Sequence, residues 1–418
     1  MSDLRRNVLA LGLDYGLFMV GLAFASQTTI LPAFAAWLGA PNVLIGAIPA
    51  VMTLGWFLPQ LFMAAHTLTL PRKLPFVIRW TIVERLPFPA LALVSFLLAE
   101  RAPAAALVLT LAMLLVMTVM GGVLMPAWLD IVGRAVPAGL RGRLFGLSAL
   151  GAGLISFGAS ALTGHALATL PPAAGYGLCF VGASVCMALS FLALLYVREP
   201  VGGPVAPRVA LRAHLARVPE LLRRDRNLSW FLAARATAIV GQMAVGFYTV
   251  YALRAWAAPA SQAAVFTALL VAGTVAGTLG FAWLADHAGH RLVILGGMAA
   301  TLGANVMALA SPTLSTYGLV FVLAGIQQAA FSVSNMPVLL EFAPSDDERP
   351  MYVGLGATSL APFAFAAPLV AGFLADALGF RAVFVVAGVG SLAGLTMLAA
   401  LVRDPRHVVA VPAVESRA

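Results

Sequence analysis

Charged residues are scarce in this sequence, and their scarcity excludes a water-soluble fold. Of 418 residues, 10% are charged and 61% are hydrophobic, whereas a soluble domain carries about 25% charged residues. A soluble protein needs polar groups over its surface, and this chain has too few to cover its apolar side chains. The lipid bilayer is the solvent in which such a composition is stable.

The sequence also lacks the features that most enzymes need. Its two cysteines, Cys179 and Cys186, lie about 10 Å apart if they share a helix, which is too far for a disulfide. The histidines show no metal-ligand spacing, and there is no P-loop, dinucleotide-binding, zinc or nucleophile-elbow motif. We therefore expect no catalytic residue, no metal, no cofactor and no enzymatic activity.

Long apolar runs are abundant, and each is close to the roughly 20 residues needed to cross a bilayer as a helix. Prolines such as Pro41, Pro71 and Pro103 mark many of their ends. Twelve spans are predicted, at residues 8–36, 43–66, 74–99, 103–127, 143–165, 173–197, 227–253, 262–285, 291–311, 314–341, 351–376 and 380–402.

The basic residues give the orientation of these spans. With the N-terminus on the cytoplasmic side, 19 of the 25 Lys and Arg residues fall in cytoplasmic segments, three fall outside (Arg101, Arg254, Arg381), and three lie within spans. Cytoplasmic loops are enriched in Lys and Arg, so we expect a multi-pass protein of the cytoplasmic membrane with both termini inside. The net charge of +9 is explained by this topology, and no nucleic-acid partner is expected.

A long polar segment divides the spans into six and six. The predicted organisation is an N-terminal six-helix bundle at 1–198, a basic cytoplasmic linker at 199–226, a C-terminal six-helix bundle at 227–403 and a cytoplasmic tail at 404–418. In the linker, Leu211, Leu215, Val218 and Leu222 have helical spacing among arginines, which favours a helix on the inner leaflet. A disordered linker is the alternative, and Pro219 favours it.

The two halves resemble each other. The fourth span ends in MPAWLD (125–130) and the tenth in MPVLLE (336–341), an offset of 211 residues. RGRLFGL (141–147) then corresponds to ERPMYVGL (348–355), and Arg6-Asn7 corresponds to Arg226-Asn227. These matches occur in the same order in equivalent spans, which indicates a duplicated six-helix unit and two pseudo-symmetric bundles in an all-α membrane protein.

Twelve spans in two parallel halves resemble the major facilitator superfamily of transporters. The loop after the eighth span, Gly280 to Arg291 with Asp286 and Gly289 inside it, is similar to a loop motif of that family, with Ala282 in place of the usual Gly. The first-half copy is eroded, because Ala64-Ala65-His66 stands where Leu-Ala-Asp is expected. The resemblance covers nearly the whole chain and implies a monomeric secondary transporter in which the two bundles rock around a central site.

Acidic and basic residues at the cytoplasmic span ends are candidates for gating salt bridges. They are Asp130, Arg141, Asp286, Arg291, Glu341 and Arg349. By the resemblance, Asp286 bridges to Arg349, and His66 acts as a pH-sensitive substitute in the first half. The alternative is that these are solvated loop charges that contribute little.

Charges within spans are costly and mark function. Asp14 and Arg235 lie at about the same depth in the first and seventh spans, which line the cavity in the resembled family. We therefore expect them to face each other, either as an ion pair between the halves or with Asp14 carrying a coupling proton. Glu84 and Arg85 crowd the third span, which is peripheral in that family, so a structural polar cluster is favoured over a proton relay.

Uncharged polar side chains at mid-depth are candidates for hydrogen bonds to a solute, with helix packing as their alternative role. They are Gln27, Gln242, Gln327, Gln328 and Asn335. So few fixed charges favour an amphipathic or neutral organic solute over sugars or di-anions.

The glycine-rich fifth span leans toward efflux, and nutrient uptake by a permease is the main alternative. A major-facilitator fold that no longer transports, serving as a scaffold or assembly factor, is the third possibility, because the first-half loop motif is eroded.

Overall fold

The structure is a computed structural model that describes residues 3–67, 69–200, 220–344 and 348–408. The described residues form helices and no strands. They include twelve helical segments that are long and apolar enough to cross a membrane, which confirms the expected all-α fold with twelve spans. The linker helix expected around Leu211, Leu215 and Val218 lies outside the described residues.

The N-terminal half contains eight helices within its described residues. These are α1 (Asp3–Phe24), α2 (Ile30–Trp37), α3 (Asn42–Thr67), α4 (Leu74–Arg85), α5 (Pro87–Leu97), α6 (Pro103–Ala135), α7 (Ala138–Thr169) and α8 (Pro172–Leu195). The third span is divided into α4 and α5, because Pro87 and Pro89 lack the N–H groups that an unbroken helix needs there.

The C-terminal half repeats this plan. Its helices are α10 (Arg226–Gln242), the 3₁₀ turn η1 (Val245–Phe247), α11 (Tyr248–Ala255), α12 (Gln262–Ala288), α13 (His290–Ala310), α14 (Leu314–Phe342), α15 (Arg349–Leu378), α16 (Phe380–Leu401) and the short α17 (Pro405–Val408). The first and seventh spans are each interrupted at equivalent places, between α1 and α2 and between α10 and α11.

Equivalent hydrogen bonds join the first and last spans of each half. Asn7 donates through Nδ2 to the carbonyl of Arg198 and accepts from its backbone N–H, at 2.9 and 2.8 Å. Asn227 makes the same pair with Arg403, at 3.0 and 2.8 Å. Each asparagine thus joins the start of the first span of its half to the residue just beyond the last span, which gives the Asn7 and Asn227 repeat a structural meaning.

The two halves contact each other at one end of the molecule. We call the end that holds Asn7 and Asn227 the inner end and the opposite one the outer end. At the outer end, Thr29 Oγ1 lies 2.6 Å from Thr267 Oγ1, and Thr249 donates to the carbonyl of Thr28 at 2.9 Å. That carbonyl is available because the first span is interrupted there.

Helices α3 and α15 form another part of this outer contact. The carboxylate of Asp376 in α15 accepts from the backbone N–H groups of Asn42 and Val43 at 3.0 Å each, and from Asn42 Nδ2 at 2.9 Å. An acidic side chain therefore stabilises the N-terminus of a helix in the other half. Arg254 also donates to Asn42 Oδ1, at 3.1 Å.

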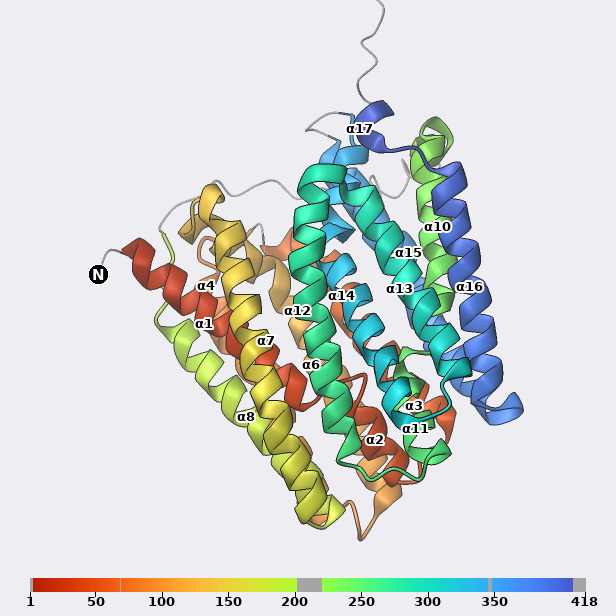
Figure 1. The fold of residues 1–418 in the computed structure, drawn as a ribbon. Coiled ribbons are helices and arrows are strands. Elements are labelled where there is room, and N and C mark those ends of the chain that lie inside the picture. Colours follow the sequence, from red (N-terminus) through yellow and green to blue (C-terminus); the bar gives the residue numbers. More distant parts are fainter. Residues whose placement is uncertain (1–2, 68, 201–219, 345–347, 409–418) are drawn as a thin grey trace, which may run out of the picture.

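Toward the inner end the halves separate. Figure 1 shows α1, α7 and α8 leaning away from α10 and α16 toward the end where α17 lies. Within the described residues, no ion pair at this end joins the N-terminal half to the C-terminal half. The described residues are therefore in contact across the halves at the outer end and are joined by no ion pair across them at the inner end.

Candidate functional site

Two carboxylates and one guanidinium form a buried cluster in the N-terminal half. Arg85 Nη2 lies 3.0 Å from Asp14 Oδ1, and Arg85 Nη1 lies 3.1 Å from Glu84 Oε2. All three residues are less than 10% exposed. Asp14 lies on α1, while Glu84 and Arg85 end α4, just where proline divides the third span.

Neutral donors complete the cluster. Ser190 of α8 donates to Asp14 Oδ1 at 2.6 Å, and Trp128 of α6 donates through Nε1 to Asp14 Oδ2 at 2.8 Å. Glu84 Oε2 accepts from Thr81 at 3.0 Å. Asp14 is thus held by Arg85, Ser190 and Trp128 on both of its oxygens, whereas both hydrogen bonds to Glu84 from described residues end on Oε2.

Arg85 is bound on every side. Besides the two carboxylates it donates through Nε to the carbonyl of Met187 at 3.1 Å and through Nη2 to Ser190 Oγ at 2.8 Å. Its guanidinium also lies over the ring of Phe18, 5.7 Å from the centroid. This set of contacts uses the planar fork of donors that Arg has and Lys lacks.

A small cavity of about 90 Å³ adjoins the cluster. Asp14, Glu84 and Arg85 line it together with apolar and aromatic residues that include Phe18 and Trp56. Gly121 of α6 leaves room for Glu84, because a Cβ at that position would lie 3.0 Å from Glu84 Oε1. The cavity is large enough for water, which needs roughly 10–15 Å³ and polar partners.

The expected pairing of Asp14 with Arg235 is wrong for this structure. Asp14 pairs with Arg85 in its own half, and Arg235 donates to Asn335 Oδ1 at 2.8 Å in the C-terminal half. The third span was expected to be peripheral, but its division at proline places Arg85 against Asp14. Asp14 and Arg235 were paired because they lie at about the same depth, but depth alone does not determine which residue each one contacts.

Arg235 has an unusual environment for a buried cation. It is 6% exposed and its guanidinium lies 5.9 Å from the ring centroid of Phe231 and 5.4 Å from that of Phe331. Among the residues that the structure describes, no carboxylate forms a salt bridge with it. Asn335, one of the expected solute-binding residues, is its hydrogen-bond partner.

The other polar candidates remain available for a ligand. The side chains of four glutamines make no hydrogen bond within the described part of the chain: Gln27, Gln242, Gln327 and Gln328. Gln27 lies at the interruption of the first span and Gln242 ends α10 at the interruption of the seventh. Interrupted helices in corresponding positions of two halves are typical of solute sites in transporters.

The expected gating residues of the N-terminal half are bound within that half. Asp130 lies 2.9 Å from Lys73 Nζ and 2.7 Å from Arg134 Nε. Arg141 donates to the backbone carbonyls of Gly133 and Val136 at 2.5 and 3.0 Å. Arg141 therefore covers the C-terminal end of α6, where carbonyl groups favour a cation.

Of the expected gating residues in the C-terminal half, Arg291 is held like Arg141, by carbonyls at a helix end. Arg291 donates to the carbonyls of Leu398, Ala399 and Val402 at the end of α16, at 2.9 to 3.1 Å. Glu341 Oε2 is buried and accepts no hydrogen bond within the described residues. The side chain of Arg349 lies outside the described residues, so its expected bridge to Asp286 stays a prediction.

Sequence analysis missed Asp376, although a repeat could have revealed it. The residues LADHAGHR (284–291) around Asp286 correspond to LADALGFR (374–381) around Asp376, and Gly289 and Gly379 both have positive φ, 92° and 84°. Only glycine adopts this backbone without strain. The two motifs lie at opposite ends of the molecule, and the one at the outer end binds the other half.

Comparison with known proteins agrees with this architecture. Residues 251–417 match the family model of the Major Facilitator Superfamily. No curated protein matches the sequence significantly.

Solved structures resemble the whole chain in fold. A nucleoside transporter, NupG, in a mutant form, is 14% identical, with a TM-score of 0.67 over 94% of this chain and 98% of its own. A bacterial homolog of the human lysosomal transporter Spinster, inward-facing and unoccupied, is 15% identical, with a TM-score of 0.64 over 98% and 96%. A POT family transporter in complex with 5-aminolevulinic acid is 11% identical, with a TM-score of 0.69 over 93% and 95%.

These likenesses establish the fold of the whole chain, and the family match covers its C-terminal part. Twelve spans in two similar halves agree with both. Residues 251–417 thus match the Major Facilitator Superfamily, and the whole chain has the fold of the solved transporter structures.

Proposed function

We propose that this chain is a proton-coupled secondary transporter that moves a small organic anion across the cytoplasmic membrane. The observation that carries the proposal is the cluster of Asp14, Glu84 and Arg85, in which two buried carboxyl groups share one guanidinium. Ionisable residues inside membrane spans are costly and are found mainly where they serve a function.

Charge balance assigns one proton to this cluster. With both carboxylates ionised the cluster carries a net charge of −1 in a low-dielectric site, where an uncompensated charge costs several kcal/mol. Binding one proton makes the cluster neutral. A change of state that admits water or a cation would release the proton, and this exchange is what coupling requires.

The hydrogen-bond donors favour Glu84 as the group that binds the proton. Asp14 accepts from three side chains on its two oxygens, and hydrogen bonds to the ionised form stabilise it. Glu84 accepts on Oε2 alone, which leaves Oε1 as the site for a proton. Asp14, the carrier proposed from the sequence, then acts by holding Arg85 in place.

Arg235 supports an anionic group on the solute. Its buried guanidinium has an amide and two aromatic rings as partners, so an anion that reaches it offsets an uncompensated charge. Phe231 and Phe331 would contact an apolar or aromatic part of the same solute. The unpaired glutamines Gln27 and Gln242 would supply neutral hydrogen bonds.

Alternating access is supported by where the halves touch. We propose that 1–198 and 227–403 move as bundles on either side of the 199–226 linker, with 404–418 as a tail. Closing the inner end would bring the charges around Asp130, Arg141, Asp286, Arg291, Glu341 and Arg349 toward the opposite half. The basic inner loops support a cytoplasmic location for that end and for both termini.

Reconstitution into liposomes tests the function. The purified chain is given an imposed pH gradient and a panel of organic anions, neutral solutes and cations of similar size, in both directions to score export and uptake. We expect an anion to move and to carry protons with it, recorded by a pH-sensitive dye inside the liposome. Glu84→Gln and Asp14→Asn should remove the effect of the gradient.

Two variants serve as controls for the assay. Glu100→Gln changes an exposed carboxyl group at the outer end and should leave the coupling intact. Arg235→Gln should lower the preference for anions while leaving proton release by the cluster. If Glu84→Gln and Asp14→Asn transport with unchanged pH dependence, the proton site is wrong. If no solute moves or shifts the melting temperature, a non-transporting scaffold is the better interpretation.

A further inference from the structure

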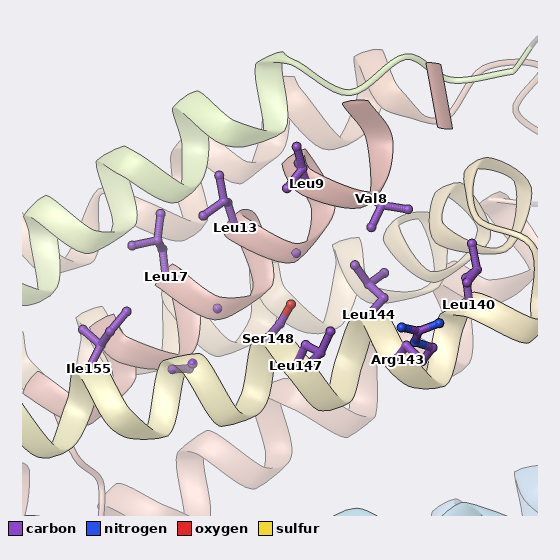
Figure 2. A pocket seen from close by; sticks show the side chains of 14 residues that line it. Val8, Leu9, Leu13, Leu17, Leu140, Arg143, Leu144, Leu147, Ser148 and Ile155 are labelled. Atoms are coloured by element: carbon purple, nitrogen blue, oxygen red, sulfur yellow. The ribbon is translucent and has the colours of Figure 1, made fainter. Parts of the chain in front are cut away.

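An apolar groove lies between α1 and α7, apart from the buried cluster. Its volume is about 540 Å³, within the roughly 300–1,000 Å³ of ligand sites. Figure 2 shows the two helices side by side, with Ser148 pointing from α7 into the space between them, Arg143 near one end and Ile155 at the other. Its walls are mainly Leu9, Leu13, Leu17, Leu144, Leu147 and Ile155.

The groove opens on the surface turned toward lipid. Leu13 and Leu147 are 56% and 67% exposed, although both lie in membrane spans. The contact of α7 with the C-terminal half is on another face, where Gly153 approaches Val275 of α12. On α1, Asp14 points away from the groove into its own bundle, so the walls face the bilayer.

Glycines shape the groove. A Cβ at Gly12 would lie 3.0 Å from Ser148 Oγ, so the helices touch closely there. A Cβ at Gly151 would meet nothing within 4 Å, so that position opens directly onto the empty space. Helices α1 and α7 are therefore in close contact near Gly12 and Ser148, and the groove lies beside this contact.

One end of the groove carries a positive charge, that of Arg143. Arg143 is exposed and lines the groove at the inner end, and no carboxylate of the described chain forms an ion pair with it. By contrast, the nearby Arg134 and Arg198 pair with Asp130 and Asp3. From Arg143 to Ile155 the helix rises about 18 Å, close to the roughly 15 Å of hydrocarbon in one leaflet.

We propose that the groove binds one anionic phospholipid of the inner leaflet. Its phosphate lies against Arg143, which is otherwise without a counter-charge, and one acyl chain runs along the leucines to Ile155. Arg and phosphate form charge-assisted hydrogen bonds, and the chain matches the length and apolar walls of the groove. A bound lipid would join α1, which carries Asp14, to α7, which contacts the other half.

Native mass spectrometry of the full chain, titrated with phosphatidylglycerol or phosphatidylcholine, tests the proposal. We expect one phosphatidylglycerol to bind in preference to phosphatidylcholine. Arg143→Gln should weaken that binding roughly fivefold, since a Lys or Arg near an anionic surface contributes about 1 kcal/mol. Gly151→Leu should abolish it, because the new side chain occupies the groove.

Gly158→Leu is the matched control. Gly158 lies two turns further along α7, also with nothing within 4 Å of a Cβ, and outside the groove. If Gly151→Leu and Gly158→Leu lose lipid equally, the bound lipid is bulk lipid that does not depend on the groove, and the proposed site is wrong. The proposal is also contradicted if Arg143→Gln binds phosphatidylglycerol as before, if both lipids bind equally, or if a second protein chain occupies this face. Arg143 is exposed, so its variant remains informative if Gly151→Leu fails to fold.

Discussion

Replacing Arg85 with Met is expected to destabilise the folded protein by about 3–5 kcal/mol, the cost of leaving buried charge without its partner. Methionine is apolar and similar in length to arginine, so it fills much of the same space. It leaves Asp14 and Glu84 as neighbouring buried carboxyl groups without a cation. It also leaves the Met187 carbonyl without its donor. Thermal unfolding in detergent at neutral pH measures the effect, and we expect a large drop in the melting temperature.

Charge removal should reverse most of this loss. When Arg85→Met is combined with Asp14→Asn and Glu84→Gln, no buried charge remains, and a buried ionic cluster replaced by neutral groups is often close to neutral in stability. Arg85→Lys should fall between, because one ammonium group cannot reach all the acceptors. If Arg85→Met alone melts like the unmodified protein, the cluster does not hold α1 and α4 together.

The second large effect concerns the outer contact between α3 and α15. Gly372→Ala places a Cβ 2.6 Å from both the carbonyl oxygen of Asn42 and the Cα of Val43. Backbone atoms cannot yield as a flexible side chain does, so we expect the outer end to open. Overpacking costs about 1–3 kcal/mol, which shifts the equilibrium between closed and open states by a factor of roughly 5 to 150.

Gly354→Ala is the matched control for this variant. Gly354 lies on the same helix, and its Cβ would meet nothing within 4 Å. Spin labels at Glu100 and Arg381, which are exposed at the outer ends of opposite halves, report the separation after Cys179 and Cys186 are replaced by Ala. The distance between the two labels should lengthen in Gly372→Ala and stay unchanged in Gly354→Ala. The same distance in both glycine variants would contradict the assigned contact.

The span count and the duplicated plan could be predicted from the sequence because each depends on properties summed over many residues. Hydropathy runs of about 20 residues identify spans, and the structure contains twelve of them. Their orientation, which the Arg and Lys asymmetry indicates, stays a prediction. The repeat of Asn7 and Asn227 was also visible, and the structure explains it by equivalent hydrogen bonds to Arg198 and Arg403.

The partner of Asp14 could not be predicted in the same way. Sequence spacing gives the depth of a residue and the face of its own helix, but not which helix packs against that face. Arg85 reaches Asp14 because the third span breaks after it, and Pro87 and Pro89 were the only sequence signs of that break. An expectation based on depth alone therefore chose Arg235.

The residues expected to form gating salt bridges show a second reason why partners are hard to predict. Arg141 and Arg291 were grouped with acidic residues by their location at span ends, yet both bind helix carbonyls. A cation near a helix C-terminus has that option whether or not an acid is nearby. Asp376, in contrast, binds the backbone N–H groups of Asn42 and Val43, and no pattern of side-chain charge in the sequence marks such a partner.

The proton proposed for the Asp14, Glu84 and Arg85 cluster is tested most directly by comparing infrared spectra of the purified protein and its variants at neutral pH. A protonated carboxylic acid absorbs separately from a carboxylate, and its band shifts in D₂O. We predict one such band in the unmodified protein that disappears in Glu84→Gln and persists in Glu100→Gln. A spectrum in which Glu84→Gln removes no protonated-acid band would contradict the account, because the proton would then not lie on Glu84.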